Sequence, residues 1–289
     1  MLGKKIIFVF VFFVSIIGFS QTNRIYIDVQ LSVENHQLEI DQKIVYYNKS
    51  QTNLDTVYLL NWANAYKDRH TPLSKRLIEN YDKSLYFAKI KKRGFSKIKS
   101  IQCNGEVVVF ENLKNAEDIV KIALPNTLKP RDSVIITTSY TVKIPLDKFT
   151  KYGYEYDKFN LRYWYLSPAV FDGKWHLMSN LDMDDIYMDP ADYHINFKIP
   201  YGYTLNSDLP GSVDLKDDYA LYQLKDHNRI DLEFNIQLVN DFSIYKTDDI
   251  EIISNLKSKN LTENIKTDVL KRQLNFIEDF LGEYPHKKL

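Results

Sequence analysis

Histidines are the side chains here that could most readily bind a transition metal or carry a proton near neutral pH. A zinc metallopeptidase places two of them on one helix in the order His-Glu-x-x-His, so that both face the same ion. The glutamate of that motif acts on the zinc-bound water. None of the six histidines precedes a glutamate; they are His36, His70, His176, His194, His227 and His286. The sequence as written therefore contains no zinc-peptidase motif.

A cluster of aspartates is a second group that could bind a cation. Oxygen ligands at close spacing suit calcium, and the cluster comprises Asp182, Asp184, Asp185, Asp189 and Asp192. However, no glycine stands where an EF-hand loop turns sharply, and no glutamate closes the loop. A solvated loop beside a sheet is therefore the favoured interpretation.

Two of the histidines lie near aromatic or apolar residues. His176 follows Trp175 and could be a metal ligand or an acid–base group. A lone histidine beside an aromatic residue is more often simply packed or at the surface. His194 lies in a strand pattern opposite apolar neighbours, and we expect it to face solvent.

A basic run of Lys89, Lys91, Lys92 and Arg93 precedes Gly94. It could contact an anionic surface. The balanced total charge favours the alternative, a charged loop that closes a hairpin.

Three tyrosines and the single cysteine also invite a functional interpretation. Tyr152, Tyr154 and Tyr156 stand at alternate positions and could line a carbohydrate or peptide groove. Alternate aromatic residues also stabilise sheets by cross-strand packing, which we favour. Cys103 precedes an Asn-Gly turn, and we interpret it as a partly buried structural thiol rather than a reactive one.

The first twenty residues have the order of a secretory signal peptide. Lys4 and Lys5 precede an apolar run at residues 6–17, and Gly18 and Ser20 supply the small residues before a cleavage site. The run is shorter than the roughly 20 residues that span a bilayer, and no later segment is apolar for long enough. We therefore expect an exported protein, periplasmic or secreted, that begins at Gln21 and has no membrane span.

Charge then argues against one class of partner. The whole chain holds 38 basic and 38 acidic residues, and loss of Lys4 and Lys5 leaves two more acids than bases. This balance gives no electrostatic footprint for nucleic acid.

Most of the mature chain alternates apolar and polar residues, a pattern typical of half-buried strands. The stretches that carry it are residues 25–33, 38–46, 54–60, 107–110, 119–124, 133–144, 195–199, 219–224 and 230–238. One short helix is expected after Thr71, a good N-cap, with Pro72 in its first turn. The pattern predicts a mainly β fold, a large antiparallel saddle or sandwich.

The character of the sequence changes near residue 242. One more strand is expected at residues 250–253, and residues 261–281 have the spacing of an amphipathic helix that ends at Gly282. A strand and one helix cannot bury their own apolar faces. We therefore expect a signal peptide at 1–20, a β domain at 21–241, and the start of a truncated second domain at 242–289.

Three stretches share their residue order with one known family. The first runs from Tyr-Tyr-Asn-Lys-Ser at residues 46–50 to Thr-Pro-Leu-Ser at residues 71–74. The second holds Tyr-Trp-Tyr-Leu-Ser-Pro at residues 163–168 and a strand at residues 192–203 that ends in a Pro-x-Gly turn. The third is Phe-Ile-Glu-Asp-Phe-Leu-Gly-Glu-Tyr-Pro at residues 276–285. Together they resemble the front half of aminopeptidase N-like zinc metallopeptidases of the gluzincin clan.

The resemblance implies a β-saddle domain followed by a thermolysin-like α/β catalytic domain that binds zinc and cleaves peptides. The family's Gly-x-Met-Glu-Asn substrate loop is absent here, because no methionine precedes a glutamate. The family's saddle also lends a Gln or Glu that holds the free amino group of the substrate. By its spacing from Trp164 and Tyr165, that position is Tyr163. A phenol with a pKa of about 10 supplies no anion near neutral pH, which puts standard aminopeptidase specificity in doubt.

The leading hypothesis is a non-catalytic N-terminal portion of an exported aminopeptidase N-like protein, which would form one wall of the substrate cleft. Zinc and the peptide substrate are then expected only in a longer parent, with its catalytic domain as the intramolecular partner. The alternative is a stand-alone exported β-sandwich that serves as a binding or adhesion module.

Overall fold

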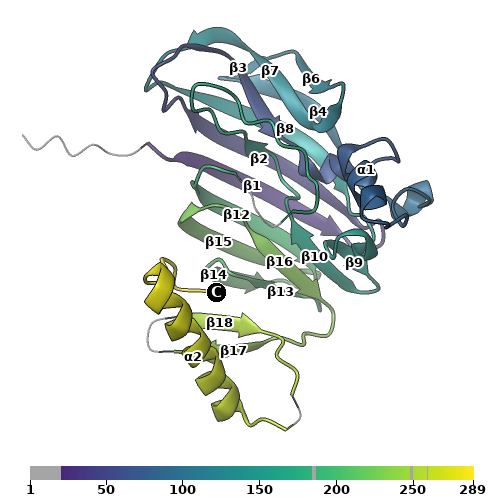
Figure 1. The fold of residues 1–289 in the computed structure, drawn as a ribbon, viewed down its shortest axis with the longest axis vertical. Helices are drawn as coiled ribbons and strands as arrows, with labels where there is room; N and C mark the ends of the chain where they lie inside the picture. The colour runs from purple at the N-terminus through teal and green to yellow at the C-terminus, as the bar shows by residue number, and fades with distance from the viewer. Residues whose placement is uncertain (1–20, 184–186, 248–249, 259) are drawn as a thin grey trace, which may run out of the picture.

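The computed structural model describes residues 21–183, 187–247, 250–258 and 260–289 (Figure 1). The expected signal peptide, residues 1–20, and two members of the aspartate cluster, Asp184 and Asp185, lie outside this described part. Three sheets form the body of the molecule, and a hairpin and a long helix lie below them in the view of Figure 1.

The largest element is an eight-stranded sheet with the order β14-β15-β12-β1-β2-β8-β4-β5. Its neighbouring strands are antiparallel except for the parallel pair β1 and β12. In β1 the apolar side chains Ile25, Ile27 and Val29 are buried, and the polar residues between them face the other side. The strands are β1 (Asn23–Ser32), β2 (Gln37–Tyr47), β4 (Phe95–Cys103), β5 (Glu106–Val107), β8 (Ser133–Lys143), β12 (Ala191–Pro200), β14 (Gly211–Leu215) and β15 (Tyr219–Arg229).

Two four-stranded sheets pack on the apolar face of the large sheet. One has the order β13-β16-β10-β9, with β13 (Thr204–Ser207), β16 (Glu233–Gln237), β10 (Lys158–Arg162) and β9 (Gly153–Glu155). The other has the order β11-β3-β7-β6, with β11 (Ser167–Pro168), β3 (Leu54–Leu60), β7 (Ala116–Leu128) and β6 (Phe110–Leu113). A single hydrophobic core contains residues of all three sheets, among them Ile27, Val57, Phe159 and Phe234. The mainly β fold with large antiparallel sheets is therefore confirmed.

Short helices connect the layers at one side of the sandwich. They are η1 (Trp62–Tyr66), α1 (Pro72–Glu79), η2 (Ile90–Lys92) and η3 (Asp147–Phe149). The predicted helix after Thr71 is confirmed: the Thr71 hydroxyl accepts a hydrogen bond from the Ser74 amide at 3.3 Å, and Pro72 begins the helix. A small separate core that includes Leu73, Leu77 and Leu85 holds this region together.

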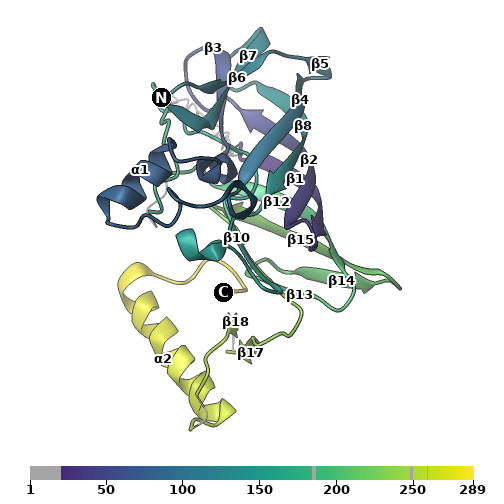
Figure 2. The same ribbon diagram turned by 90° about the vertical axis from the view of Figure 1, so that its right-hand side faces the viewer.

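The last part of the chain forms its own small unit (Figure 2). It consists of a hairpin of β17 (Ser243–Lys246) and β18 (Glu251–Ser254), the helix α2 (Glu263–Leu281), and a final segment whose backbone forms hydrogen bonds with β18. The predicted helix and its stop are confirmed, since α2 ends at Gly282 with a φ of 89°. Its core contains Tyr245, Ile250, Ile252 and Leu274.

Three local predictions are wrong. Residues 107–110 do not form one strand, because β5 ends at Val107 and β6 begins at Phe110. The basic run at residues 89–93 does not close a hairpin, because β3 and β4 belong to different sheets. The alternate tyrosines do not share one strand face: Tyr152 precedes β9, and Tyr156 lies in the following turn with a φ of 51°.

Candidate functional site

Tyr163, the predicted cleft residue, follows directly after β10. Its φ of 55° is in the left-handed region, which turns the chain out of the strand. The side chain is almost wholly buried, and its ring packs edge-on against Trp62 with the centroids 4.8 Å apart. Leu60 and Ile119 belong to the same buried cluster. Tyr163 is therefore part of a packed aromatic wall rather than a side chain that projects into solvent.

The guanidinium of Arg162 covers the other side of this wall. Its central carbon lies 4.5 Å from the centre of the Tyr163 ring, a cation–π distance. The guanidinium also donates to the Asp231 carboxylate at 2.8 Å and to the Tyr152 hydroxyl at 2.9 Å. Burial opposes its charge, but the bonds to Tyr152 and Asp231 outweigh that effect and hold the pKa of Arg162 above its usual value. Arg162 is therefore a fixed cation whose charge Asp231 balances. It is not suited to donate a proton.

A buried carboxylate stands at the far side of Trp62. Asp118 accepts hydrogen bonds from the Asn180 amide at 2.7 Å and from the Ser179 hydroxyl at 2.9 Å. Burial raises the pKa of Asp118. The Trp62 indole in turn donates to the Met178 carbonyl at 2.7 Å. These bonds tie the segment at residues 178–180 to β7 and η1. Asp118 directly precedes the apolar stretch at residues 119–124. An acid at this position was the available sequence signal, and sequence reasoning missed it.

The described members of the aspartate cluster have separate partners. Asp189 pairs with Lys49 at 3.1 Å, and Asp192 accepts from the Asn228 amide at 3.1 Å. The amide of Asp182 donates to the Asn180 side chain at 3.0 Å. Within the residues that the structure describes, no three His, Cys, Asp or Glu side chains are placed to hold one metal ion. The His, Cys, Asp and Glu side chains of the described residues therefore do not fit a zinc ion, and they support no chemical step on zinc.

The two histidines singled out in the sequence lie in different places. His176 is packed as expected, with its Nε2 atom 2.7 Å from the Asp172 carboxylate and its ring against Tyr187. His194 lies on the open face of the large sheet, where its ring stacks on Tyr26 with centroids 4.8 Å apart. Burial against its neighbours lowers the pKa of His194, and nearby His227 adds to the effect.

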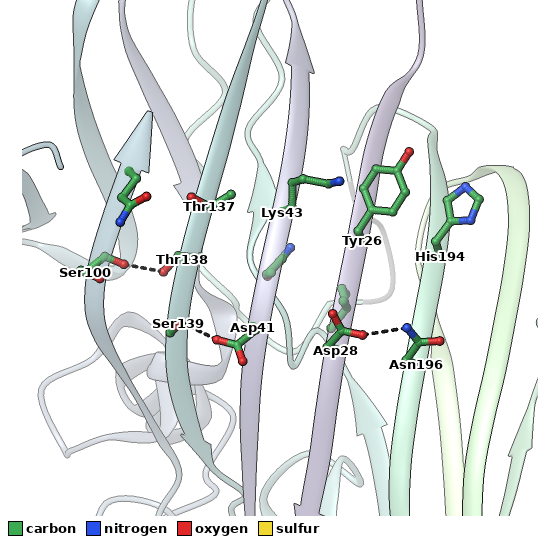
Figure 3. Close-up of a pocket in the computed structure, with 13 residues that line it drawn as sticks. Tyr26, Asp28, Asp41, Lys43, Ser100, Thr137, Thr138, Ser139, His194 and Asn196 are labelled. Carbon is green, nitrogen blue, oxygen red and sulfur yellow. Dashed lines mark hydrogen bonds between the residues drawn. The ribbon is translucent and has the colours of Figure 1, made fainter. Parts of the chain in front are cut away.

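The open face of the eight-stranded sheet carries a polar pocket of about 530 Å³ (Figure 3). Strand register builds it in rows. One row contains Asn196 of β12, Asp28 of β1, Asp41 of β2, Ser139 of β8 and Ser100 of β4, each a cross-strand partner of the next. The next row contains His194, Tyr26, Lys43, Thr137 and Gln102 in the same strand order. The pocket is thus a product of pairing between segments that are distant in the sequence.

The pocket's side chains suit hydrogen bonding rather than catalysis. Asn196 donates to Asp28 at 2.7 Å, and Ser139 donates to Asp41, which is the cross-strand partner of Asp28. The Lys43 ammonium lies 4.1 Å from the centre of the Tyr26 ring. Two adjacent carboxylates with amide and hydroxyl neighbours can accept hydrogen bonds from a polar ligand and disfavour an anion.

Comparison with known proteins gives a fold relationship. No protein-family model and no curated protein matches the sequence. Among solved structures, an M1 zinc metallopeptidase from Deinococcus radiodurans superposes with a TM-score of 0.56 at 12% identity, over 92% of this chain and 54% of that one. The chain shares its fold with part of the M1 zinc metallopeptidases.

Related structures give the same result. A mutant of the Deinococcus radiodurans enzyme bound to a Tyr-Ser-Ala substrate matches with a TM-score of 0.56 at 12% identity, over 92% of this chain and 54% of that one. A two-domain M1 zinc metallopeptidase mutant bound to L-tryptophan matches with a TM-score of 0.55 at 11% identity, over 92% of this chain and 56% of that one. The chain thus spans about half the length of these structures. The family resemblance of the sequence is supported at the level of the fold.

The length and the hydropathy of the helices bear on membrane crossing. No helix within the described ranges combines the length and the apolar character that a bilayer crossing requires.

Proposed function

We propose that this chain is the non-catalytic N-terminal portion of an exported aminopeptidase N-like metallopeptidase, where it forms one wall of the peptide-substrate cleft. The observation that carries the proposal is the fold match to M1 zinc metallopeptidases over 92% of the chain, which corresponds to about half of each neighbour. His-Glu-x-x-His and Gly-x-Met-Glu-Asn do not occur in this sequence, and in this proposal the zinc chemistry would belong to a longer parent.

The wall at Tyr163 supports the same proposal. Trp62, Tyr152 and Tyr163 form a contiguous aromatic cluster, largely buried, that Arg162 and Asp231 hold in place. Such a packed cluster would make the proposed cleft wall rigid without taking part in the chemistry. One neighbour was solved with a tripeptide substrate, and a peptide is accordingly the ligand that we propose for the parent. The neutral, buried phenol at position 163 would not hold a substrate amino group as a carboxylate in the cleft does.

The helix α2 supports a covering domain in the parent. Its apolar residues Phe276, Phe280 and Leu281 are exposed, although they have the spacing of a buried helix face. In the proposed parent, the remainder of a thermolysin-like domain would cover this face.

A hydrolysis assay tests the proposal directly. The chain from Gln21 to Leu289 would be incubated with a panel of aminoacyl p-nitroanilides and equimolar zinc, with and without a chelator. We expect no chelator-sensitive hydrolysis. Zinc-dependent turnover that the chelator abolishes would contradict a non-catalytic role.

The pocket on the open sheet face favours a second candidate function, a stand-alone binding module. The adjacent carboxylates Asp28 and Asp41 would then bind a neutral or cationic polar ligand. Titration with short peptides and oligosaccharides, followed by NMR, separates the two candidates. Saturable binding in the micromolar range that Asp28→Ala abolishes would favour the module, whereas perturbation confined to Tyr152 and Tyr163 would favour the cleft wall.

A further inference from the structure

A second surface of the protein combines exposed apolar side chains with positive charge. It is the segment from Tyr81 to Lys99, here called the basic lobe, which leads from the end of α1 through η2 into β4. Three large side chains of the lobe are mostly exposed: Tyr81 by 93%, Phe87 by 73% and Ile90 by 81%. The part of the lobe next to α1 projects from the side of the sandwich in both views (Figures 1 and 2).

Lysines stand between and after these apolar residues in the sequence. The exposed lysines of the lobe are Lys83, Lys89, Lys91, Lys92, Lys97 and Lys99. Asp82 is the lobe's single acid, and its carboxylate accepts a hydrogen bond from the Ser84 amide at 2.7 Å. Across the described part of the chain, no acid lies within ion-pair distance of any of these six lysines. Because the whole chain has balanced charge, the lobe is a local concentration of unpaired cations.

The lobe is held in a defined shape. Arg93 is buried, and its guanidinium donates to the carbonyls of Ala88 and Tyr86, both at 3.1 Å. Leu85 is fully buried in the small core beside α1, two residues before the exposed Phe87. The fold thus places one apolar residue of this turn inside and the next one outside. Exposure of Phe87 and Ile90 follows from fixed local packing.

We infer that the basic lobe docks on the surface of an anionic phospholipid bilayer as a peripheral contact. Phe87, Ile90 and Tyr81 would enter the headgroup region, where aromatic and aliphatic side chains leave water. The surrounding lysines would lie at the level of the lipid phosphates, attracted by the negative surface potential. Such a contact needs no membrane-spanning helix.

The composition of the lobe argues against the other classes of partner. Protein interfaces are depleted in lysine, whereas this surface is dominated by it. A nucleic acid would neutralise the lysines and stack on the aromatic rings, but it would leave the aliphatic Ile90 in water. An anionic bilayer offers phosphates to the lysines and an apolar interior to the aromatic and aliphatic side chains.

Vesicle co-sedimentation tests the inference. The mature chain would be mixed with vesicles of phosphatidylcholine alone, or of phosphatidylcholine with phosphatidylglycerol, at low and high salt. We expect the protein to bind the anionic vesicles about tenfold or more tightly than the neutral ones. High salt should weaken the binding to the anionic vesicles. The variant Phe87→Ser with Ile90→Ser should lower partitioning by a similar factor, because the inserted apolar area is lost.

Matched variants separate the lobe from general surface effects. Val107→Ser with Val109→Ser removes two comparably exposed apolar residues around the end of β5, and should leave binding within about twofold. Lys89→Gln, Lys91→Gln and Lys92→Gln together should abolish the preference for anionic lipid. The same change at the exposed residues Lys114, Lys129 and Lys174 should reduce it much less. Tryptophan fluorescence of Phe87→Trp should shift to the blue when anionic vesicles are added.

Several results would overturn the inference. They are no binding to anionic vesicles, equal losses in the lobe and control variants, or tighter binding to a single-stranded oligonucleotide than to vesicles. Because the lobe contains neither Tyr163 nor its partners Trp62, Tyr152 and Arg162, none of these results bears on the cleft-wall proposal.

Discussion

Gln42 interrupts the apolar face of β2, and its contacts explain why a polar side chain lies in the core. The side-chain amide donates to the Leu166 carbonyl at 2.7 Å, and its oxygen accepts from the Leu166 amide at 3.2 Å. The hydroxyl of buried Tyr140 donates to the same oxygen. Gln42 therefore satisfies the backbone of a residue that is distant in the sequence, beside Trp164 and Tyr165. The alternation of the sequence locates the exception but cannot identify its partner.

Replacement of this glutamine should be costly. Gln42→Ala leaves the Leu166 carbonyl without its side-chain donor and the buried Tyr140 hydroxyl without its acceptor, although the Leu166 amide keeps its bond to Tyr140. The change should lower the free energy of unfolding by about 1–3 kcal/mol. Urea denaturation followed by circular dichroism measures the change. The matched control is Gln30→Ala on the exposed face of β1, which should change stability by less than about 0.5 kcal/mol. Equal changes in the free energy of unfolding at the two positions would show that the hydrogen bonds to Leu166 do not stabilise the protein.

Asp208 predicts a pH dependence. Burial raises the pKa of this carboxyl from 3.8 to about 6, against the opposing attraction of Arg229, whose Nη2 atom lies 3.3 Å away. Between these two pH values the native protein holds a proton that the unfolded chain has released. The contribution of Asp208 to stability therefore decreases as the pH rises from about 4 to about 6.

The variant Asp208→Asn isolates this effect. A shift of about two pKa units corresponds to at most ~3 kcal/mol, and the partial exposure of the side chain reduces it. We expect the wild-type stability to fall relative to that of Asp208→Asn as the pH rises through this interval. Half-buried His286 titrates in both proteins and cancels in the comparison. Parallel stability curves for the two proteins would refute the assignment.

Other single residues behave as their sequence context indicates. Cys103 is fully buried rather than partly buried as predicted, and burial raises the pKa of its thiol to about 11, which is consistent with a structural thiol. Tyr163 is harder to interpret from sequence. Its position after a strand could be predicted, but its packing on Trp62 depends on a segment about a hundred residues earlier.

At the scale of elements, local patterns were sufficient for most of the long strands and for both α-helices. Period-two alternation is a local property, and so are the caps at Thr71 and Gly282. Pairing is not local. The parallel pairing of β1 with β12 joins the first and the later part of the chain, and it alone brings Asp28 beside Asn196 in the pocket. The short strands β9, β13 and β14 carry too few residues for a periodic signal.

The two faces of α2 should respond differently to substitution. Leu274 is only 7% exposed and packs with Ile250 and Ile252, whereas Phe276 and Phe280 are 64% and 74% exposed. Leu274→Ala should therefore destabilise the C-terminal unit by about 2 kcal/mol or more. Phe276→Ser with Phe280→Ser should change it by less than about 0.5 kcal/mol. Native-state hydrogen exchange of the α2 amides reports both values.

The opposite ranking would have a clear meaning. If the phenylalanine variants destabilised α2 more than Leu274→Ala, the outer face would be packed in the isolated chain. The proposal that another domain covers it in the parent would then lose its support.

For the molecule as a whole, the sequence predicted a mainly β fold, and the structure has it. The resemblance to aminopeptidase N-like proteins is supported as a shared fold with M1 zinc metallopeptidases. The polar pocket and the basic lobe were not predicted as surfaces. Both depend on which residues the assembled sheets leave exposed. The sequence showed the basic run at residues 89–93 and indicated an anionic contact as one alternative, but the balanced total charge favoured a hairpin loop instead.

The most direct test of a non-catalytic chain is its zinc content. A protein of residues Gln21 to Leu289 would be dialysed and its metals counted by mass spectrometry. We predict far less than one zinc per chain, because no histidine precedes a glutamate and the described residues hold no three-ligand group. One tightly bound zinc per chain would contradict the proposal and would indicate a site that includes residues outside the described part, such as Asp184 and Asp185.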